Sequence, residues 1–130
     1  MNNLDRNIKK NIDKNCTVYE TADFLGKRWT IVILLELFKG EENKKRYSEI
    51  KNSIHGITPK LLSLRLKELE REGLVTKEID ATQFPVKCEY SLTESGMDFF
   101  NIIKGIKKWA LKWKIDNIVC EKANCKECEL

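Results

Sequence analysis

The sequence predicts a mainly α-helical domain with a small β-hairpin. Three observations support this prediction: a strong helix start at Thr58, two strand-like segments at 74–80 and 87–92, and a long apolar stripe near the end. In chain order these give several helices, a sharply capped helix, a hairpin and a final helix. Two helices in close succession followed by a β-hairpin are typical of a winged helix-turn-helix.

Composition indicates one folded domain. The chain has 130 residues, of which 42% are apolar and 34% charged, which is enough for a core and too apolar for intrinsic disorder. The longest apolar run, Ile31 to Leu35, is far below the roughly 20 residues that a membrane span needs. Residues 1–15 lack the apolar stretch of a secretory signal. We therefore expect a cytoplasmic protein with no membrane partner.

The first half of the chain predicts two helical regions. Apolar side chains recur at helical spacing over residues 17–38, and Gly26 is expected to break this region because glycine is a poor helix former. A charged loop is expected at 41–46. Ser48 is then a candidate N-cap for a short helix over 49–53.

The second half has the clearest element boundaries. Thr58 is a good N-cap and Pro59 suits the first helical position, so a helix is expected from there to about Glu72. Residues 81–85 have the length of a hairpin tip between the two strands. Thr93 is expected to cap one long final helix. The apolar stripe of that helix comprises Phe99, Ile102, Ile103, Ile106, Trp109, Ala110 and Trp113.

Basic residues gather around the capped helix. Residues 44–77 contain nine Lys or Arg against four Glu, whereas the whole chain has 24 basic against 20 acidic residues. Such a patch suits phosphate contacts and counterion release; alternatively, it is a solvated helix face with pairs such as Arg65 with Glu68. With Leu62 and Leu66 toward the core, the opposite face is polar and basic. That face carries Lys60, Ser63, Leu64, Lys67 and Arg71.

Several short motifs follow one another along the chain. They are Leu25-Gly26-Lys27-Arg28-Trp29-Thr30, Arg46-Tyr47-Ser48-Glu49-Ile50, Gly56-Ile57-Thr58-Pro59-Lys60-Leu61-Leu62-Ser63, the segment 66–75 and the segment 89–96. The ordered set is collinear from about Cys16 to Trp113 and resembles the HxlR-type transcription regulators. The resemblance implies a dimeric winged-helix protein that binds double-stranded DNA.

The resemblance also implies roles for parts of the chain. Residues 58–71 would be the recognition helix and the hairpin around Pro85 the wing. The N-terminal segment and the last helix would form the dimer interface, within a domain of residues 1–115 that is followed by a tail, 116–130. The DNA-binding residues expected from this resemblance and from the outward face are Thr58, Lys60, Ser63, Leu64, Lys67, Arg71 and Lys87.

The sequence departs from the family pattern at three places. Leu64 stands where the family commonly has a polar residue, so the base preference is open. This leucine suits contact with a thymine methyl group, or it is an ordinary surface leucine. Val86 replaces the second residue of a frequent proline pair, and the tail after Asp116 has no counterpart.

Five cysteines in a cytoplasmic chain favour thiols or metal ligands over disulfides. Cys16 matches a cysteine that acts as a thiol sensor in some members of the family, or it is an inert thiol. Cys120, Cys125 and Cys128 have a spacing that suits zinc or an iron–sulfur cluster, with Cys16 as a candidate fourth ligand. The alternatives are a tail of reduced thiols or a redox-active pair of Cys125 and Cys128.

These observations favour a sequence-specific DNA-binding transcription regulator that acts as a homodimer. A response to redox state or metal through the cysteines is a further hypothesis. The alternative is a small redox or metal-binding protein whose helix-turn-helix docks a protein partner. An enzyme is not expected, because the chain has a single histidine, His55, no glycine-rich phosphate loop and no Ser/His/Asp set around that histidine.

Overall fold

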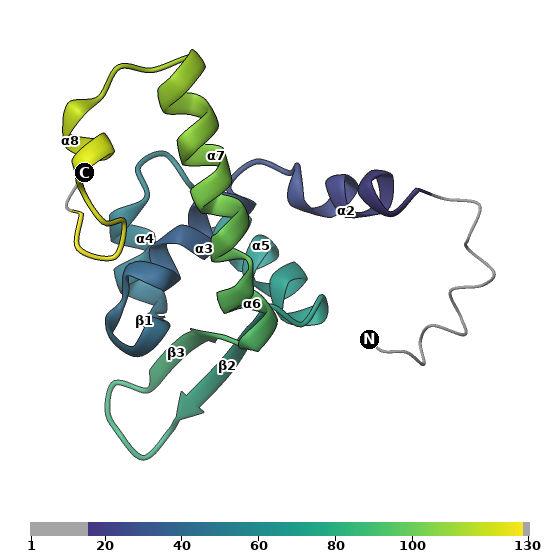
Figure 1. The fold of residues 1–130 in the computed structure, drawn as a ribbon. Helices are drawn as coiled ribbons and strands as arrows, with labels where there is room; N and C mark the ends of the chain where they lie inside the picture. The colour runs from purple at the N-terminus through teal and green to yellow at the C-terminus, as the bar shows by residue number, and fades with distance from the viewer. Residues whose placement is uncertain (1–15, 129–130) are drawn as a thin grey trace.

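The computed structural model describes residues 16–128, and Figure 1 shows helices arranged around a small sheet. Predictions for residues 1–15 and 129–130 lie outside this range. No helix among the described residues is both long and apolar enough to cross a membrane. The elements are α2 (Thr17–Leu25), α3 (Thr30–Lys39), η1 (Glu41–Asn43), β1 (Lys44–Arg46), α4 (Tyr47–Ser53), α5 (Pro59–Arg71), β2 (Val75–Asp80), β3 (Lys87–Leu92), α6 (Glu94–Asp98), α7 (Phe100–Trp113) and α8 (Ile118–Lys122).

The expected break in the first helical region is confirmed. Helix α2 ends at Leu25 and is capped by Gly26, whose N–H donates to the carbonyl of Ala22 at 2.8 Å. Trp29 then has a φ of 81°, in the left-handed region that a helix cannot pass through. The chain therefore changes direction before α3, and α2, which buries none of its residues, projects away from the body of the molecule (Figure 1).

Helices α4 and α5 form the helix-turn-helix. The prediction that Ser48 caps the first of them is wrong: α4 begins at Tyr47, and Arg46 takes the N-cap position. The Glu49 carboxylate accepts the Arg46 backbone N–H at 2.8 Å, which supplies the capping interaction instead. The prediction for α5 is confirmed, since the Thr58 hydroxyl accepts the Leu61 N–H at 3.1 Å.

The sheet has three antiparallel strands in the order β1-β3-β2. The hairpin of β2 and β3 was expected, with Val75 opposite Leu92 and Asp80 opposite Lys87. The prediction of a charged loop at 41–46 is wrong for its second half. There β1 pairs with the free edge of β3 and places Lys45 opposite Tyr90. Three consecutive basic residues carry no alternating apolar pattern, so β1 depends on its partner strand rather than on its own sequence.

The final helix is divided in two, which corrects the prediction of one continuous helix. Thr93 caps α6 by accepting the Gly96 N–H at 3.2 Å. The Phe99 carbonyl accepts the N–H of Ile102 at 2.8 Å. This bond between residues three apart, as in a 3₁₀ helix, tightens the turn at the junction of α6 and α7.

The core lies between α3, α5, the sheet and the base of α7. Each large side chain buried there contributes about 1.5–3 kcal/mol to the free energy of folding. The core packs against one face of α5 only and leaves the opposite face of that helix uncovered. The core includes Ile33, Leu34, Leu37, Ile50, Ile54, Ile57, Leu62, Leu66, Leu69, Val75, Tyr90, Leu92, Phe99 and Ile103.

Candidate nucleic-acid interface

The outward face of α5 is the candidate interface. Leu62, Leu66 and Leu69 are buried, as the helical periodicity predicted. Leu64 is 47% exposed in the middle of the opposite face. The exposed residues of α5 and its cap include Thr58, Lys60, Ser63, Leu64, Lys67 and Arg71.

The cations on this face differ from the basic residue beside the core. The Arg65 guanidinium lies 3.3 Å from the Glu68 carboxylate, so the alternative of an intrahelical pair holds for this arginine. Within residues 16–128, however, Lys60, Lys67 and Arg71 have no ion-pair partner. Three exposed charges without internal partners are available to an external anion.

Tyr47 fixes the position of α5 relative to α4. Its hydroxyl donates to the carbonyl of Pro59 at 3.1 Å and lies 3.3 Å from the Ser63 hydroxyl. The first contact satisfies a polar group in the first turn of α5, and the second orients a hydroxyl on the outward face. The sequence reasoning did not identify Tyr47 as part of the site, because this role depends on a contact between two helices.

A charge cluster around the buried Glu68 holds the other side of α5. Glu68 is only 8% exposed, and its carboxylate lies 3.1 Å from the Lys27 ammonium as well as close to Arg65. The Arg65 Nε also donates to the carbonyl of Arg28 at 2.9 Å. A buried carboxylate needs such partners to offset its desolvation. The cluster therefore fixes α5 against the junction of α2 and α3.

The predicted cation of the wing, Lys87, has an acidic neighbour. Lys87 keeps 29% of its side chain exposed and lies 3.9 Å from the Glu89 carboxylate. At the tip, the Asp80 carboxylate accepts hydrogen bonds from the N–H and hydroxyl of Thr82 and from Gln83. These bonds, chiefly those from Thr82, hold the pKa of Asp80 below its ordinary value of 3.8. The hairpin thus has an ordered tip, with the Phe84 ring 98% exposed beyond it.

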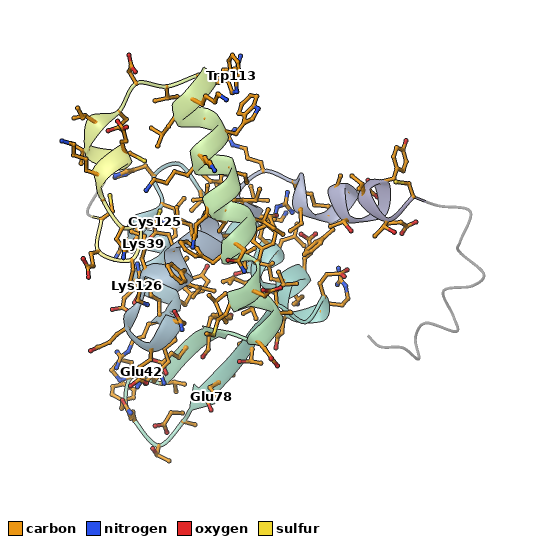
Figure 2. The ribbon with its side chains drawn as sticks, in the orientation of Figure 1. Lys39, Glu42, Glu78, Trp113, Cys125 and Lys126 are labelled. Atoms are coloured by element: carbon orange, nitrogen blue, oxygen red, sulfur yellow. The ribbon has the colours of Figure 1, made fainter. Side chains whose placement is uncertain are left out.

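A second surface, on α2 and α7, is apolar. The predicted stripe of the last helix is buried at Phe99 and Ile103 only. Its other large members are 44–65% exposed, and Trp113 stands at the far end of α7 (Figure 2). Helix α2 adds further exposed apolar side chains. This α2–α7 surface comprises Val18, Tyr19, Ile102, Ile106, Trp109 and Trp113.

All five cysteines are thiols, outside any disulfide. Cys16 is exposed at the start of α2, and Cys88 packs against the core, where burial and a hydrogen bond that the Tyr90 hydroxyl donates to the Cys88 sulfur raise the pKa of Tyr90. Across residues 16–128, no three His, Cys, Asp or Glu side chains gather in an arrangement that would hold a metal ion. The described structure therefore does not bring Cys120, Cys125 and Cys128 together as metal ligands, with or without Cys16.

The tail packs against the domain. The Lys107 ammonium donates to the carbonyl of Ala123 at 2.8 Å, and the Lys126 ammonium donates to the carbonyls of Phe38 and Gly40 at 2.6 and 2.7 Å. The chain thus returns from the end of α7 to the end of α3 (Figure 1). Sequence reasoning had no signal for this contact, because a lysine that will dock on distant carbonyls looks like any surface lysine.

Known proteins are similar to this chain in both sequence and fold. The sequence profile of the HxlR-like helix-turn-helix family matches residues 24–117. The uncharacterized HTH-type transcriptional regulator YvaP of Bacillus subtilis is 39% identical over 104 residues, which cover 79% of this chain and 93% of YvaP.

Solved structures agree with this assignment. The reduced form of the transcriptional regulator YodB from B. subtilis is 35% identical with a TM-score of 0.67, over 79% of this chain and 98% of YodB. The redox regulator HypR in its oxidized form is also 35% identical with a TM-score of 0.67, over 77% of this chain and 99% of HypR. The winged-helix prediction is confirmed by these neighbours, which are transcription regulators rather than enzymes. The chain belongs to the HxlR-like helix-turn-helix family and is a transcription regulator of the helix-turn-helix type.

Proposed function

We propose that this regulator binds double-stranded DNA sequence-specifically, with α5 in the major groove. The observation that carries the proposal is the outward face of α5, where Lys60, Lys67 and Arg71 are exposed without ion-pair partners among the described residues. The Thr58 cap and the Tyr47 hydroxyl support the end of α5 that would enter the groove. Phosphate contacts from these cations would position the helix, and Ser63 and Leu64 would meet base edges.

A salt titration of DNA binding tests this proposal. The probe is DNA from upstream of the protein's own gene, and the measurement is fluorescence anisotropy from low to moderate salt. The double variant Lys60→Ala/Lys67→Ala should bind more weakly, and the slope of log K against log salt should flatten by about two units, about one for each phosphate that is no longer neutralised.

The matched control removes a lysine elsewhere. Lys122 is exposed on α8, away from the proposed interface, so Lys122→Ala should keep the wild-type slope. An unchanged slope in the double variant would mean that α5 does not face the phosphates. A wild-type protein with no salt-sensitive DNA binding would favour the alternative function, in which the helix-turn-helix docks a protein partner.

We propose further that the protein acts as a homodimer through the α2–α7 surface. Two large tryptophan side chains, Trp109 and Trp113, are 56% and 65% exposed on one stripe with Ile106. An apolar stripe of this kind is characteristic of an interface between subunits. Pairing about a two-fold axis would present two copies of α5 to successive turns of DNA, about 34 Å apart.

We also propose that the protein acts in the cytoplasm and that it responds to oxidation of the Cys16 thiol. This cysteine is exposed at the first turn of α2, the helix that would enter the dimer interface. The structural neighbours include regulators described in reduced and oxidized forms. A change of oxidation state at this position would act directly on the packing of α2. No metal is part of this proposal.

A further inference from the structure

Lys126 fixes the C-terminal segment to the end of α3. Its ammonium donates to the carbonyls of Phe38 and Gly40 at 2.6 and 2.7 Å and to the Asn43 side-chain oxygen at 3.1 Å. It also lies 5.0 Å from the centroid of the Phe38 ring. The last carbonyls of a helix lack partners within the helix and attract cations. Lys126 therefore serves as the C-terminal cap of α3, supplied from far along the chain.

The backbone around Lys126 forms two consecutive tight turns. The N–H of Glu127 donates to the Asn124 carbonyl at 3.0 Å, and the N–H of Cys128 donates to the Cys125 carbonyl at 3.4 Å. The Asn124 side chain accepts the N–H of Lys126 at 2.8 Å and holds the first turn. A bond of this kind closes a turn of four residues. Cys125 and Cys128 are consequently the first and last residues of one turn.

The two ends of this turn are close enough for a disulfide bond to join Cys125 and Cys128. The ends of a turn closed by such a bond lie within about 7 Å, and the Cα atoms of disulfide-bonded cysteines lie about 4.4–6.8 Å apart. Both residues are thiols here, and both are partly exposed. Cys125 also lines an open pocket of about 380 Å³. The side chains around that pocket include Phe38, Phe100, Lys104, Lys107 and Lys126.

We propose that Cys125 and Cys128 are a dithiol site that hydroperoxides oxidise to an intramolecular disulfide, and that this disulfide locks Lys126 onto α3. The sulfur of Cys125 attacks a peroxide oxygen, the O–O bond breaks, and water or an alcohol leaves. The resulting sulfenic acid is attacked by the sulfur of Cys128, which forms the S–S bond and releases its oxygen as water. Two electrons and two protons pass from the two thiols to the peroxide.

The disulfide would act through the turn. Closing the ring removes alternative conformations of residues 125–128, so Lys126 remains directed at its carbonyls. The end of α3 leads directly into η1 and β1, and Lys107 ties the same segment to α7 through Ala123. Oxidation would thus fasten together α3, the edge strand of the sheet and the last long helix. This inference does not depend on DNA binding.

A peptide map of the oxidised full-length protein tests the site. The sequence separates all five cysteines onto different tryptic peptides: 15–27, 88–104, 115–122, 123–126 and 127–130. After hydrogen peroxide treatment and alkylation of remaining thiols, peptides 123–126 and 127–130 should appear linked, and a reductant should separate them. Cys128→Ser should lose this link. A link from Cys125 or Cys128 to Cys16 or Cys120, or full alkylation of both peptides, would overturn the assignment.

Hydrogen exchange tests the lock in the same samples, without DNA. Amide exchange over residues 38–43 and 123–128 should slow on oxidation of the wild type and of the control variant Cys120→Ser. Lys126→Gln should still form the disulfide and yet lose the slowing over 38–43. A disulfide that forms in the wild type without slower exchange would contradict the lock. Because neither measurement involves DNA, their results stay separate from those on the proposed function.

Discussion

Among the single residues of the outward face of α5, Leu64 stands out because its side chain is apolar. It lies between exposed polar and basic neighbours and keeps 47% of its surface exposed. No core contact needs it there, since Leu62 and Leu66 already fill the buried face. A side chain with this exposure and position is suited to the methyl group of a thymine.

Changing Leu64 should therefore change which sequence is bound more than how tightly DNA is bound. Leu64→Gln would replace the proposed methyl contact with an amide that prefers adenine, and a good contact of this kind discriminates by about 1–3 kcal/mol. Selection of binding sites from a randomised DNA pool measures the preference, and anisotropy measures the overall affinity. The companion variant Leu64→Ala removes the contact without adding a new one. Identical selected sites for all three proteins would place Leu64 off the bases.

Residues on one helix were easier to predict than residues that act between helices. Thr58 and the outward face of α5 follow from a local cap and from a period of 3.6 residues, and the structure places them as expected. Tyr47 and the contact of Glu68 with Lys27 were missed because contacts such as those to Pro59 and Lys27 join segments that the sequence does not place side by side. The proposed roles in DNA binding remain predictions.

Among the helices and strands, α5 and the hairpin could be predicted from local sequence, whereas β1 and the end of α6 could not. Helix α5 carries its own start and stop signals, and the hairpin strands recur in the expected places. Strand β1 exists only because β3 offers it an edge, and α6 ends where Phe99 turns toward the core. Elements with local boundaries are predictable, whereas those defined by a partner are not.

The wing gives a pH-dependent prediction at this scale. Because hydrogen bonds from Thr82 and Gln83 favour the charged carboxylate of Asp80, its pKa in the folded protein lies below 3.8. These bonds contribute to order at the tip above the pKa of the unfolded chain, and this contribution is lost as the pH falls through the lower, folded value. An NMR titration should therefore show the Thr82 amide resonance moving with a midpoint below 3.8.

A variant isolates this carboxylate. Asp80→Asn keeps the size of the side chain and cannot titrate, so the movement of the Thr82 resonance should disappear. The fold away from the wing should not respond, because Asp80 lies on the surface at the end of β2. A midpoint at or above the ordinary value of 3.8 would contradict the hydrogen-bonded tip.

For the whole molecule, the main unpredicted feature is the return of the tail to α3. Nothing in the sequence relates Lys126 to Phe38, because the two residues are 88 positions apart and the contact is to a backbone carbonyl. The α2–α7 surface shows the converse. Its apolar period was evident in the sequence, yet of its large side chains only Phe99 and Ile103 are buried within the described chain, and a second copy is the partner that we propose for the rest.

The oligomeric state is the prediction that belongs to the whole molecule. In sedimentation equilibrium at micromolar concentration, the wild type should be a dimer. Ile106→Glu places a charge in the middle of the proposed interface, where burial without a partner is costly, and should shift the protein to monomer. Lys108→Glu is the matched control, because residue 108 lies about 200° around α7 from residue 106 and so faces away from the stripe.

The same pair of variants links assembly to DNA binding. A monomer presents one α5, so Ile106→Glu should lose the tight binding that two half-sites give, while circular dichroism remains helical. Lys108→Glu should stay dimeric and keep most of its affinity. A wild-type monomer, or an Ile106→Glu protein that remains a dimer, would mean that the exposed tryptophans of α7 serve another contact. In that case the two recognition helices would not be spaced by α7.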